Sequence, residues 1–322
     1  MWKIGNLKID GKVVLAPMAG ITSVGYRNFM IPFGVSLCVT EMVSDMGLIY
    51  GNDETKEYLS FHKSDAPIGV QLFGYNPFNL VKSAQIAQKM NKNIDFFDIN
   101  MGCPVPKVTK TGAGSSLMKN PKLCGEIIRE IKKVTDIPVT AKIRLGWDDK
   151  SVNFLEVIEE LEKAGVDAIC IHARTRAELY SGFPHYELLK DLQKQMHVPL
   201  IISGNIFTLD EAIEALDITG AKAVMVARGG MGNPFLIKQI DHYYCTGEKL
   251  PNPMLDEQKQ WCLELGQTLT KTMGELRAMK IYRGIAPKFF NGFPGAKAIK
   301  VRLATELTDL DSLETILNSI HF

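Results

Sequence analysis

The segment Val139-Thr-Ala-Lys-Ile-Arg-Leu145 alternates apolar and polar side chains. Successive side chains of a β-strand point to opposite sides. Thr140, Lys142 and Arg144 therefore share one face, and the four apolar residues share the other. The apolar face suits a cover of helices, while the polar face suits the inside of a barrel. The segment thus predicts one strand of a barrel with polar side chains inside.

Seven further short, apolar and β-branched runs lie along the chain, and the starts of neighbouring runs are 23 to 43 residues apart. The eight runs are 13–17, 37–42, 68–73, 96–101, 139–145, 168–174, 200–205 and 223–227. Each gap has room for one helix, and helix-period patterns occupy 79–90 and 154–164. Strands that alternate with helices predict parallel β-α-β units. Eight units in about 220 residues predict an α/β fold of the (β/α)8 TIM-barrel type.

A doubly wound open sheet is the main alternative fold. Its first strand would be followed by a G-x-G-x-x-G turn. The first run here is followed by Met18-Ala19-Gly20-Ile21, which does not match that turn. The barrel is therefore the favoured prediction.

The strand pattern stops after residue 240. Pro251-Asn252-Pro253 is typical of a linker, and Trp261, Leu265, Leu269 and Met273 then recur on one helix face. We therefore expect a barrel domain at 1–244 and a small all-helical domain at 245–322.

Composition limits the possible partners. Apolar residues make up 46% and charged residues 23%, as in ordinary globular proteins, and 37 basic against 36 acidic residues exclude a basic coat over the whole surface. The segment 274–302 differs, because it holds seven basic residues and one acid, together with Tyr282, Phe289 and Phe290. This bias favours contact with RNA phosphates over a merely solvated helix face.

Other features bear on compartment, metal and assembly. No apolar run approaches the ~20 residues of a membrane helix, and the N-terminus does not resemble a signal peptide. The six cysteines form no C-x-x-C pair, which indicates reduced thiols and a cytoplasmic protein. We expect no metal site, because no Cys/His cluster has zinc-ligand spacing. Nothing marks an oligomer interface, so we expect a monomer.

Polar residues interrupt six of the predicted strands near their carboxyl ends, where barrels of this type carry their active sites. They are Glu41, Gln71, Asp98, Asn100, Lys142, Arg144, His172, Arg174, Ser203 and Asn205. A purely structural interior would favour Val, Ile and Leu at these positions. The pattern therefore predicts an active site on this rim.

Two glycine-containing loops indicate a phosphate site. Ser203-Gly204-Asn205 ends the seventh predicted strand, and Ala227-Arg228-Gly229-Gly230 ends the eighth. Loops at these two positions often hold a phosphate through backbone N–H groups. Glycine permits close backbone approach, and the Arg228 guanidinium would add charged donors.

Cys103 differs from the other cysteines because it lies in a Gly-Cys-Pro loop at a strand end. A thiol on the catalytic rim can act as a nucleophile or as a general acid. The glycines of Gly112-Ala-Gly-Ser-Ser116 suggest a mobile loop that closes on the substrate.

Taken together, these motifs resemble the tRNA-dihydrouridine synthase family, most closely its bacterial B-type subgroup. The resemblance rests on Ala16-Pro-Met-Ala-Gly-Ile-Thr22, Thr40-Glu-Met42, Asp98-Ile-Asn-Met-Gly-Cys-Pro-Val-Pro-Lys-Val108, Lys142-Ile-Arg-Leu-Gly-Trp147, Ile171-His-Ala-Arg-Thr-Arg176, Met225-Val-Ala-Arg228 and Gly232-Asn-Pro234. These stretches span the predicted barrel in order, and the helical C-terminal domain matches the family in length.

The resemblance implies an FMN enzyme that uses NADPH to reduce tRNA uridines to 5,6-dihydrouridine. It implies that Pro17, Met18 and Ala19 line the flavin, that Gln71 and Lys142 contact its ring near His172, and that Ser203, Gly204, Asn205, Ala227 and Arg228 hold its phosphate and ribityl chain. Cys103 would be the proton donor. Asn100, Arg174 and Arg176 would meet the RNA, with Lys280 and Arg283 of the basic segment.

Two departures and two alternatives accompany this interpretation. The family usually has Asn-Gly-Asp at Ser203-Gly204-Asn205 and Gly-Arg at Ala227-Arg228, and neither change removes the backbone donors.

One alternative is an FMN barrel oxidoreductase for a free small molecule such as a pyrimidine, which would not need the basic tail. The other is a non-catalytic RNA-binding protein, which would not need Cys103 with Lys142 and His172.

Overall fold

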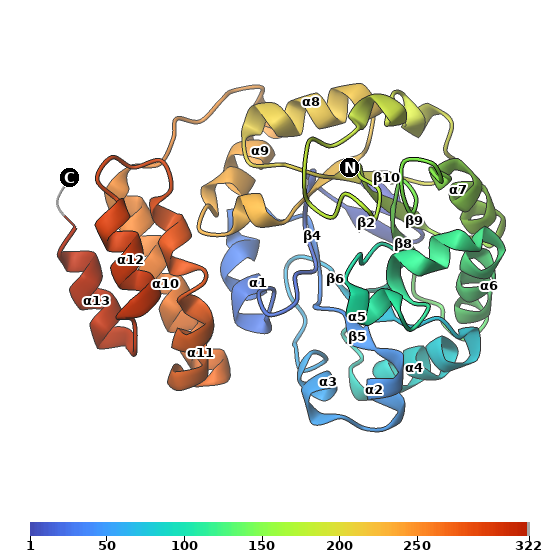
Figure 1. Cartoon of the computed structure of the whole chain (residues 1–322), viewed down its shortest axis with the longest axis horizontal. Coiled ribbons are helices and arrows are strands. Elements are labelled where there is room, and N and C mark those ends of the chain that lie inside the picture. Colours follow the sequence, from blue (N-terminus) through green and yellow to red (C-terminus); the bar gives the residue numbers. More distant parts are fainter. Residues whose placement is uncertain (321–322) are drawn as a thin grey trace.

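The structure is a computed structural model that describes residues 1–320, except for the side chain of Glu54. Eight parallel strands close into a barrel, which confirms the predicted TIM-barrel fold (Figure 1). They are β3 (Val13–Leu15), β4 (Leu37–Val39), β6 (Ile68–Phe73), β7 (Phe96–Asn100), β8 (Val139–Arg144), β9 (Ala168–His172), β10 (Leu200–Ser203) and β11 (Ala223–Val226). The barrel closes because β3 pairs with both β4 and β11, and a short strand, β5 (Val43–Ser44), adds to β6.

The strand register brings polar residues side by side at the carboxyl ends. Gln71 pairs with Asp98, Asn100 with Lys142, and His172 with both Arg144 and Ser203. The alternation in β8 is as predicted, since Val139, Ala141 and Ile143 are buried in the core shared with the outer helices. The fold thus collects six strand ends at one mouth of the barrel.

Helices surround the barrel in the gaps between the strands. They are α1 (Val24–Met30), α2 (Asp45–Ile49), α3 (Asp53–Glu57), α4 (Pro77–Met90), α5 (Pro106–Thr109), α6 (Pro121–Lys132), α7 (Phe154–Lys163), α8 (Leu209–Thr219) and α9 (Phe235–Thr246). The gap between β9 and β10 differs, because it holds only short 3₁₀ segments at Tyr186–Leu189 and Leu192–Lys194. Its first part, 175–185, is a loop toward the barrel mouth that includes Gly182 and Pro184, residues that disfavour a helix.

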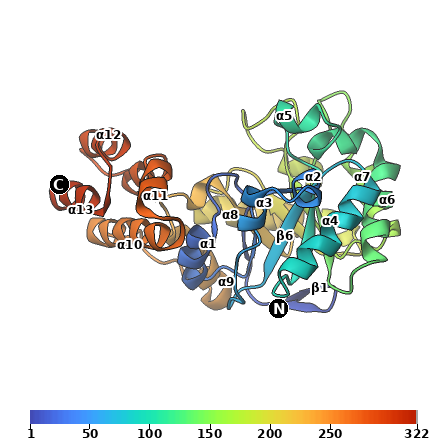
Figure 2. The same cartoon turned by 90° about the horizontal axis from the view of Figure 1, so that it is seen from below.

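An N-terminal hairpin closes the opposite end of the barrel. Strands β1 (Trp2–Ile4) and β2 (Leu7–Ile9) pair antiparallel, and Gly5 turns between them with a φ of +56°. Ile4 and Ile9 are fully buried against the interior side chains of the barrel. The hairpin therefore leaves the carboxyl end of the barrel as its open mouth (Figure 2 shows β1 on the opposite side from α5).

The C-terminal part is a helical bundle beside the barrel, formed by α10 (Leu255–Met273), α11 (Glu275–Tyr282), α12 (Lys297–Thr305) and α13 (Leu310–Asn318) (Figure 1). The loop 247–254 leads into it from α9. The Trp261 ring stacks on Phe235 at 5.5 Å and meets the edge of Phe33 at 5.5 Å. A Cβ on Gly25 of α1 would lie 3.3 Å from the Thr268 carbonyl oxygen. The bundle is thus packed closely against the side of the barrel that carries α1 and α9.

No helix within residues 1–320 is both long enough and apolar enough to span a bilayer.

Candidate active site

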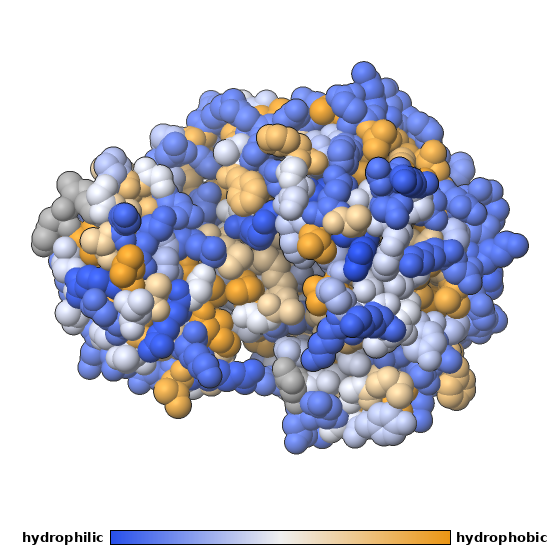
Figure 3. All heavy atoms as spheres, in the orientation of Figure 1, coloured by the Kyte–Doolittle hydropathy of each residue, from blue (hydrophilic) through white to orange (hydrophobic). Residues whose placement is uncertain are grey.

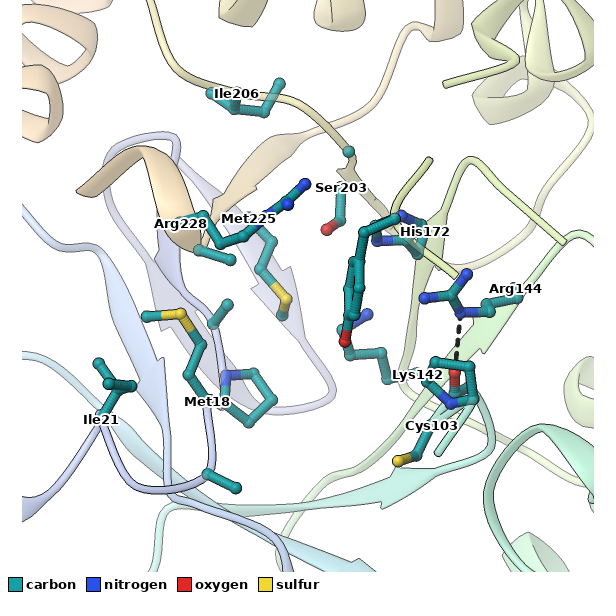
Figure 4. A pocket seen from close by; sticks show the side chains of 18 of the residues that line it. Met18, Ile21, Cys103, Lys142, Arg144, His172, Ser203, Ile206, Met225 and Arg228 are labelled. Carbon is teal, nitrogen blue, oxygen red and sulfur yellow. Dashed lines mark hydrogen bonds between the residues drawn. The ribbon is translucent and has the colours of Figure 1, made fainter. Parts of the chain in front are cut away.

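A cavity of about 410 Å³ opens at the carboxyl ends of the strands, which is within the ~300–1,000 Å³ usual for small-molecule and cofactor sites. It brings together most of the predicted site residues. They are Pro17, Met18, Ala19, Gln71, Asn100, Cys103, Lys142, His172, Ser203, Gly204, Asn205, Ala227 and Arg228. In Figure 4, Met18 lies across the cavity from Cys103 and Lys142, and Ser203 and Arg228 lie at a third edge. The thiol of Cys103 and the amine of Lys142 therefore lie apart from the guanidinium of Arg228.

The loop after β3 forms one wall of the cavity. Pro17, Met18 and Ala19 line it, and the Met18 amide donates to Thr22 Oγ1 at 2.9 Å. Glu41, predicted as a polar strand end, accepts from the Gly20 amide at 2.5 Å. Glu41 therefore braces this wall and is not among the residues that line the cavity.

A chain of hydrogen bonds runs beneath the cavity from Asp98 to Cys103. Asp98 accepts from Thr140 Oγ1 at 2.6 Å and from Gln71 Nε2 at 2.7 Å. Gln71 Oε1 accepts from Asn100 Nδ2 at 2.8 Å. Asn100 Oδ1 in turn accepts from the Cys103 amide at 2.8 Å. Residues of β6, β7 and β8 thus fix where the cysteine loop begins.

The Cys103 loop is also held from its other side. The Cys103 carbonyl oxygen accepts from the Ser115 amide at 3.0 Å and from Ser115 Oγ at 2.9 Å. A Cβ on Gly114, where φ is +60°, would lie 2.7 Å from that oxygen. The Gly-Ala-Gly stretch thus allows a close approach that fixes the cysteine.

The Cys103 side chain is half-buried, and its sulfur points into the cavity (Figure 4). Burial raises the pKa of this thiol, and the Val105 amide, Arg144 and Lys142 offset only part of the rise. Cys103 is therefore a thiol, not a thiolate, at neutral pH. A group that holds its proton and faces a cavity can act as a general acid.

Positive charge dominates the cavity wall, because none of the acidic side chains that the structure describes lines it. Within the same part of the chain, Lys142 Nζ and the Arg228 guanidinium form no hydrogen bond or ion pair. The Arg228 guanidinium instead lies over the rings of Tyr180 and Phe207, at 5.0 Å and 5.6 Å. Two unneutralised cations in one cavity favour a bound anion.

The loops after β10 and β11 pack backbone against backbone. A Cβ on Gly229 would clash with the Ile206 carbonyl oxygen, and a Cβ on Gly204, where φ is +140°, would lie 3.0 Å from Pro184. The Gly204 and Asn205 amides donate to no group in the described part of the chain. The amides of Arg228 and Gly229, the first two of the 3₁₀ turn Arg228–Gly230, also have no partner within that turn. These amides, together with Arg228, could bind a phosphate group.

His172 is neutral in this setting. Burial, with smaller contributions from Lys142, Arg144 and two further arginines, holds its pKa well below the ordinary value. Arg174 Nη1 lies 3.3 Å from His172 Nε2. Because arginine can only donate, the neutral ring accepts at Nε2 and carries its proton on Nδ1.

Arg144 and Tyr180 also line the cavity; Arg144 was predicted only as one of the polar rim residues, and Tyr180 was not predicted. The Arg144 side chain is buried and donates to the carbonyl oxygens of Gly102 at 2.9 Å, Thr175 at 2.7 Å and Leu179 at 2.8 Å. It thus ties the cysteine loop to the loop after β9. The alternation of Arg144 with Lys142 along the strand was the sequence feature that indicated Arg144, whereas Tyr180 lies in a loop without periodicity.

The structure corrects the expectation that Arg174 meets RNA. Arg174 is fully buried and donates to Ser181 O at 2.8 Å, Gly182 O at 2.6 Å and Asn205 Oδ1 at 3.0 Å. No part of it is exposed for RNA, so its role is to hold the loop 175–185 against Asn205. Asn205 has a φ of +44°, a backbone conformation that asparagine tolerates better than most residues.

Three of the other four residues predicted to meet RNA lie outside the cavity. Arg176 is half-buried beside the barrel mouth, while Lys280 and Arg283 are exposed on the bundle. Arg283 Nε donates to the Leu307 carbonyl oxygen at 2.7 Å. Asn100 does line the cavity, but its Nδ2 group already donates to Gln71 Oε1 at 2.8 Å and to Met42 Sδ at 4.0 Å.

The basic segment 274–302 is less available than its composition suggested. Tyr282, Phe289 and Phe290 are buried in the core, so the expectation that these aromatics join an RNA surface is wrong. Arg277 Nη1 donates to both carboxylate oxygens of Glu57, and Arg302 pairs with Glu306. The cations of this segment that form no hydrogen bond or ion pair in the described chain are Lys280, Lys288 and Lys297.

Among residues 1–320, no group of three or more His, Cys, Asp or Glu side chains could hold a metal ion.

Comparison with known proteins adds a family to this geometry. Residues 14–320 match the sequence model of the family described as dihydrouridine synthase (Dus). A probable tRNA-dihydrouridine synthase of Rickettsia bellii is 35% identical, over 92% of this chain and 90% of its own length. The tRNA-dihydrouridine synthase B of Pseudomonas aeruginosa is 33% identical over 96% and 92%, and that of Shewanella oneidensis is 33% identical over 87% of both chains.

A solved structure supports the fold alone. The old yellow enzyme homologue of Zymomonas mobilis superposes with a TM-score of 0.54 at 11% identity, over 80% of this chain and 94% of that one.

Proposed function

Because this chain belongs to the dihydrouridine synthase family, as a B-type member, we propose that it reduces uridine in tRNA to 5,6-dihydrouridine, with bound FMN and with NADPH as reductant. One observation carries the proposal. A protonated thiol, Cys103, and an unpaired cation, Lys142, face the same cavity, which no acidic side chain of the described chain lines. A small-molecule oxidoreductase would share the cavity but would not need the exposed lysines of the bundle.

The residues that line the cavity would hold FMN in one orientation. Arg228 and the amides after β10 and β11 would bind its phosphate, and Pro17, Met18 and Ala19 would form the wall beside its ring. Lys142, with Gln71 and His172, would contact the ring from the opposite side. When bound and reduced, FMN supplies a hydride to C6 of uracil.

The chain's own groups complete the reduction. The Cys103 Sγ–H donates its proton to C5, so that the hydride and this proton together saturate the C5–C6 double bond. The Lys142 cation stabilises the negative charge of the reduced cofactor. The uridine must leave its stack to enter the cavity, which costs a few kcal/mol. Asn100, whose Oδ1 holds the Cys103 amide, would contact the base next to the proton donor.

The first test is the visible spectrum of the purified protein. A flavin spectrum that NADPH bleaches is the expected result. A protein without flavin, and unable to take up added FMN, would contradict the proposed cofactor.

Arg228→Ala and Lys142→Ala are expected to fail in different ways. Loss of Arg228 removes charge-assisted bonds to the phosphate, worth ~1.5–3 kcal/mol, and should weaken FMN binding roughly 10- to 100-fold. Loss of Lys142 should leave FMN bound but slow its use about 10²–10³-fold, as for the removal of one electrostatic donor. FMN titration and stopped-flow reduction separate the two effects. Equal loss of bound flavin in both variants would contradict this division of roles.

The exposed lysines of the bundle are expected to contact RNA phosphates. The double variant Lys280→Ala/Lys297→Ala should bind all tRNA sequences more weakly, because phosphate contacts carry no base information. A plot of the logarithm of its tRNA-binding constant against the logarithm of the salt concentration should have a slope that is shallower by roughly 0.7–0.9 for each phosphate that is no longer held. We call this slope the log–log salt slope. Lys89→Ala, at the exposed end of α4, is the matched control. A double variant that binds with the salt slope of this control would show that these lysines are only solvated.

A further inference from the structure

We propose that Lys119 and Trp147 extend the RNA contact expected of Arg176 into a second RNA-phosphate site, on the side of the barrel mouth away from the bundle. We call these three residues the tryptophan stack. The inference rests on the proposed function, because it takes tRNA as the substrate, and it adds a contact surface that the active-site cavity does not include.

The tryptophan stack gathers two cations on one indole. Lys119 Nζ lies 3.4 Å from the centroid of the Trp147 ring, and the Arg176 guanidinium carbon lies 4.4 Å from it. Contacts of this kind fix where a cation sits without neutralising it. Trp147 is therefore a positioning residue that holds two long, flexible side chains beside each other.

No acid neutralises these cations in the described part of the chain, where neither forms an ion pair or a side-chain hydrogen bond. Arg176 Nε is buried without a partner. Asp148, next to Trp147, accepts from Ser151 Oγ at 2.6 Å, and Glu178 accepts from Thr175 and His185. Two like charges held together repel each other, and a bound anion would relieve that repulsion.

The tryptophan stack is built on rigid backbone. The Arg176 amide donates to Gly146 O at 2.9 Å, and the Ala177 amide donates to Trp147 O at 2.9 Å, so the loops after β8 and β9 are joined. Lys119 ends the 3₁₀ segment Gly114–Lys119, whose Ser115 holds the Cys103 carbonyl oxygen. An anion on the stack therefore lies next to the segment that positions the proton donor.

The strand order places the tryptophan stack across the mouth from the bundle. Its residues follow β7, β8 and β9, whereas the bundle packs on α1 and α9, which follow β3 and β11. In the closed order β3-β4-β6-β7-β8-β9-β10-β11, β8 is half-way round the barrel from β3. Figure 3 shows this face, where hydrophilic side chains surround a hollow with apolar side chains.

A polyanion that crosses the mouth is the ligand that fits this arrangement. Lysines of the bundle would hold its phosphates on one side, and Lys119 and Arg176 would hold them on the other. RNA bound at both sides would present one nucleotide to the cavity between them. A free nucleotide is too short to reach both sides, so the stack favours a large folded RNA over a small substrate.

The test is tRNA binding by the full-length holoenzyme over a range of salt concentrations. The double variant Lys119→Ala/Arg176→Ala is expected to bind more weakly, with a log–log salt slope shallower by about 1.4–1.8, as for two phosphate contacts. The charge-conserving variant Lys119→Arg/Arg176→Lys should keep the wild-type slope, and Lys89→Ala is the distant control. Because Arg176 is half-buried, Lys119→Ala alone, at an exposed site, provides a variant that does not disturb the joined loops; its expected change is about 0.7–0.9.

The outcomes separate the two proposals. A wild-type enzyme that reduces tRNA, with variants that keep the salt slope of Lys89→Ala, would overturn the tryptophan stack as an RNA contact and leave the proposed function intact. A wild-type enzyme that neither binds nor reduces tRNA would overturn the proposed function, and the stack with it. A shallower slope in both alanine variants, together with an unchanged flavin spectrum, is the result that the inference predicts.

Discussion

Cys103→Ala is expected to reduce tRNA about 10²–10⁴-fold more slowly than the wild-type enzyme, because general acids typically contribute that much. The thiol faces the cavity, and its loop is fixed by Asn100 on one side and by Ser115 on the other. NADPH oxidation with an artificial electron acceptor should be nearly unchanged, since that reaction needs no proton from Cys103. Single-turnover assays of the two half-reactions measure the difference.

The pH dependence of the rate of tRNA reduction provides a control for this prediction. Burial raises the pKa of Cys103, so the thiol keeps its proton up to a pH above the ordinary range of cysteine. A proton donor stops working as pH rises through its own pKa, so tRNA reduction should fall only on that alkaline side. Cys103→Ser, whose hydroxyl stays protonated but is a weaker acid, should lack this limb of the profile and be slow throughout. An alanine variant within a few-fold of the wild-type rate would contradict the proton-donor role.

Arg174→Ala is expected to lower the free energy of unfolding by about 3–5 kcal/mol, because three hydrogen bonds from a charged donor, worth ~1.5–3 kcal/mol each, are lost and water replaces them in part. The carbonyl oxygens of Ser181 and Gly182 and the Asn205 side chain would each lose a donor. The loop 175–185 would then lose its hold on the cavity wall, where Tyr180 lies. Urea unfolding, with and without added FMN, measures the effect.

Arg174→Lys provides the comparison for this effect. Lysine keeps the charge but lacks the planar fork that reaches several acceptors at once, so an intermediate loss is expected. Arg176→Ala, in the same loop but only half-buried, should cost much less stability. A loss below about 1 kcal/mol in Arg174→Ala would show that water replaces the guanidinium and that the loop does not depend on it.

The barrel could be predicted because its signal is local. Alternation within 139–145 assigned both faces of β8 correctly, and the spacing of the eight runs gave the order of the strands. The N-terminal hairpin was missed because its strands have three residues each, too few for a periodic pattern. The connection between β9 and β10 has no full helix, because its residues 175–185 form a loop at the barrel mouth.

The sequence predicted only those site residues that lie at the ends of strands. Residues on inward faces, such as Gln71, Lys142 and His172, meet in the cavity because parallel strands end at one rim. Whether a side chain there is free depends on long-range contacts that one strand does not show. Arg174 is taken up by Ser181, Gly182 and Asn205, which the chain brings to it from other loops. For the same reason, composition could not show that the aromatics of 274–302 pack inward.

The most direct test of the proposed function is the mass of the nucleosides in unmodified tRNA after incubation with the flavin-loaded enzyme and NADPH. We expect that uridine gains two hydrogens and appears as 5,6-dihydrouridine, that free uridine is not reduced at a comparable rate, and that Cys103→Ala yields little product. Unchanged tRNA, under conditions in which NADPH still reduces the bound flavin, would contradict the proposed function.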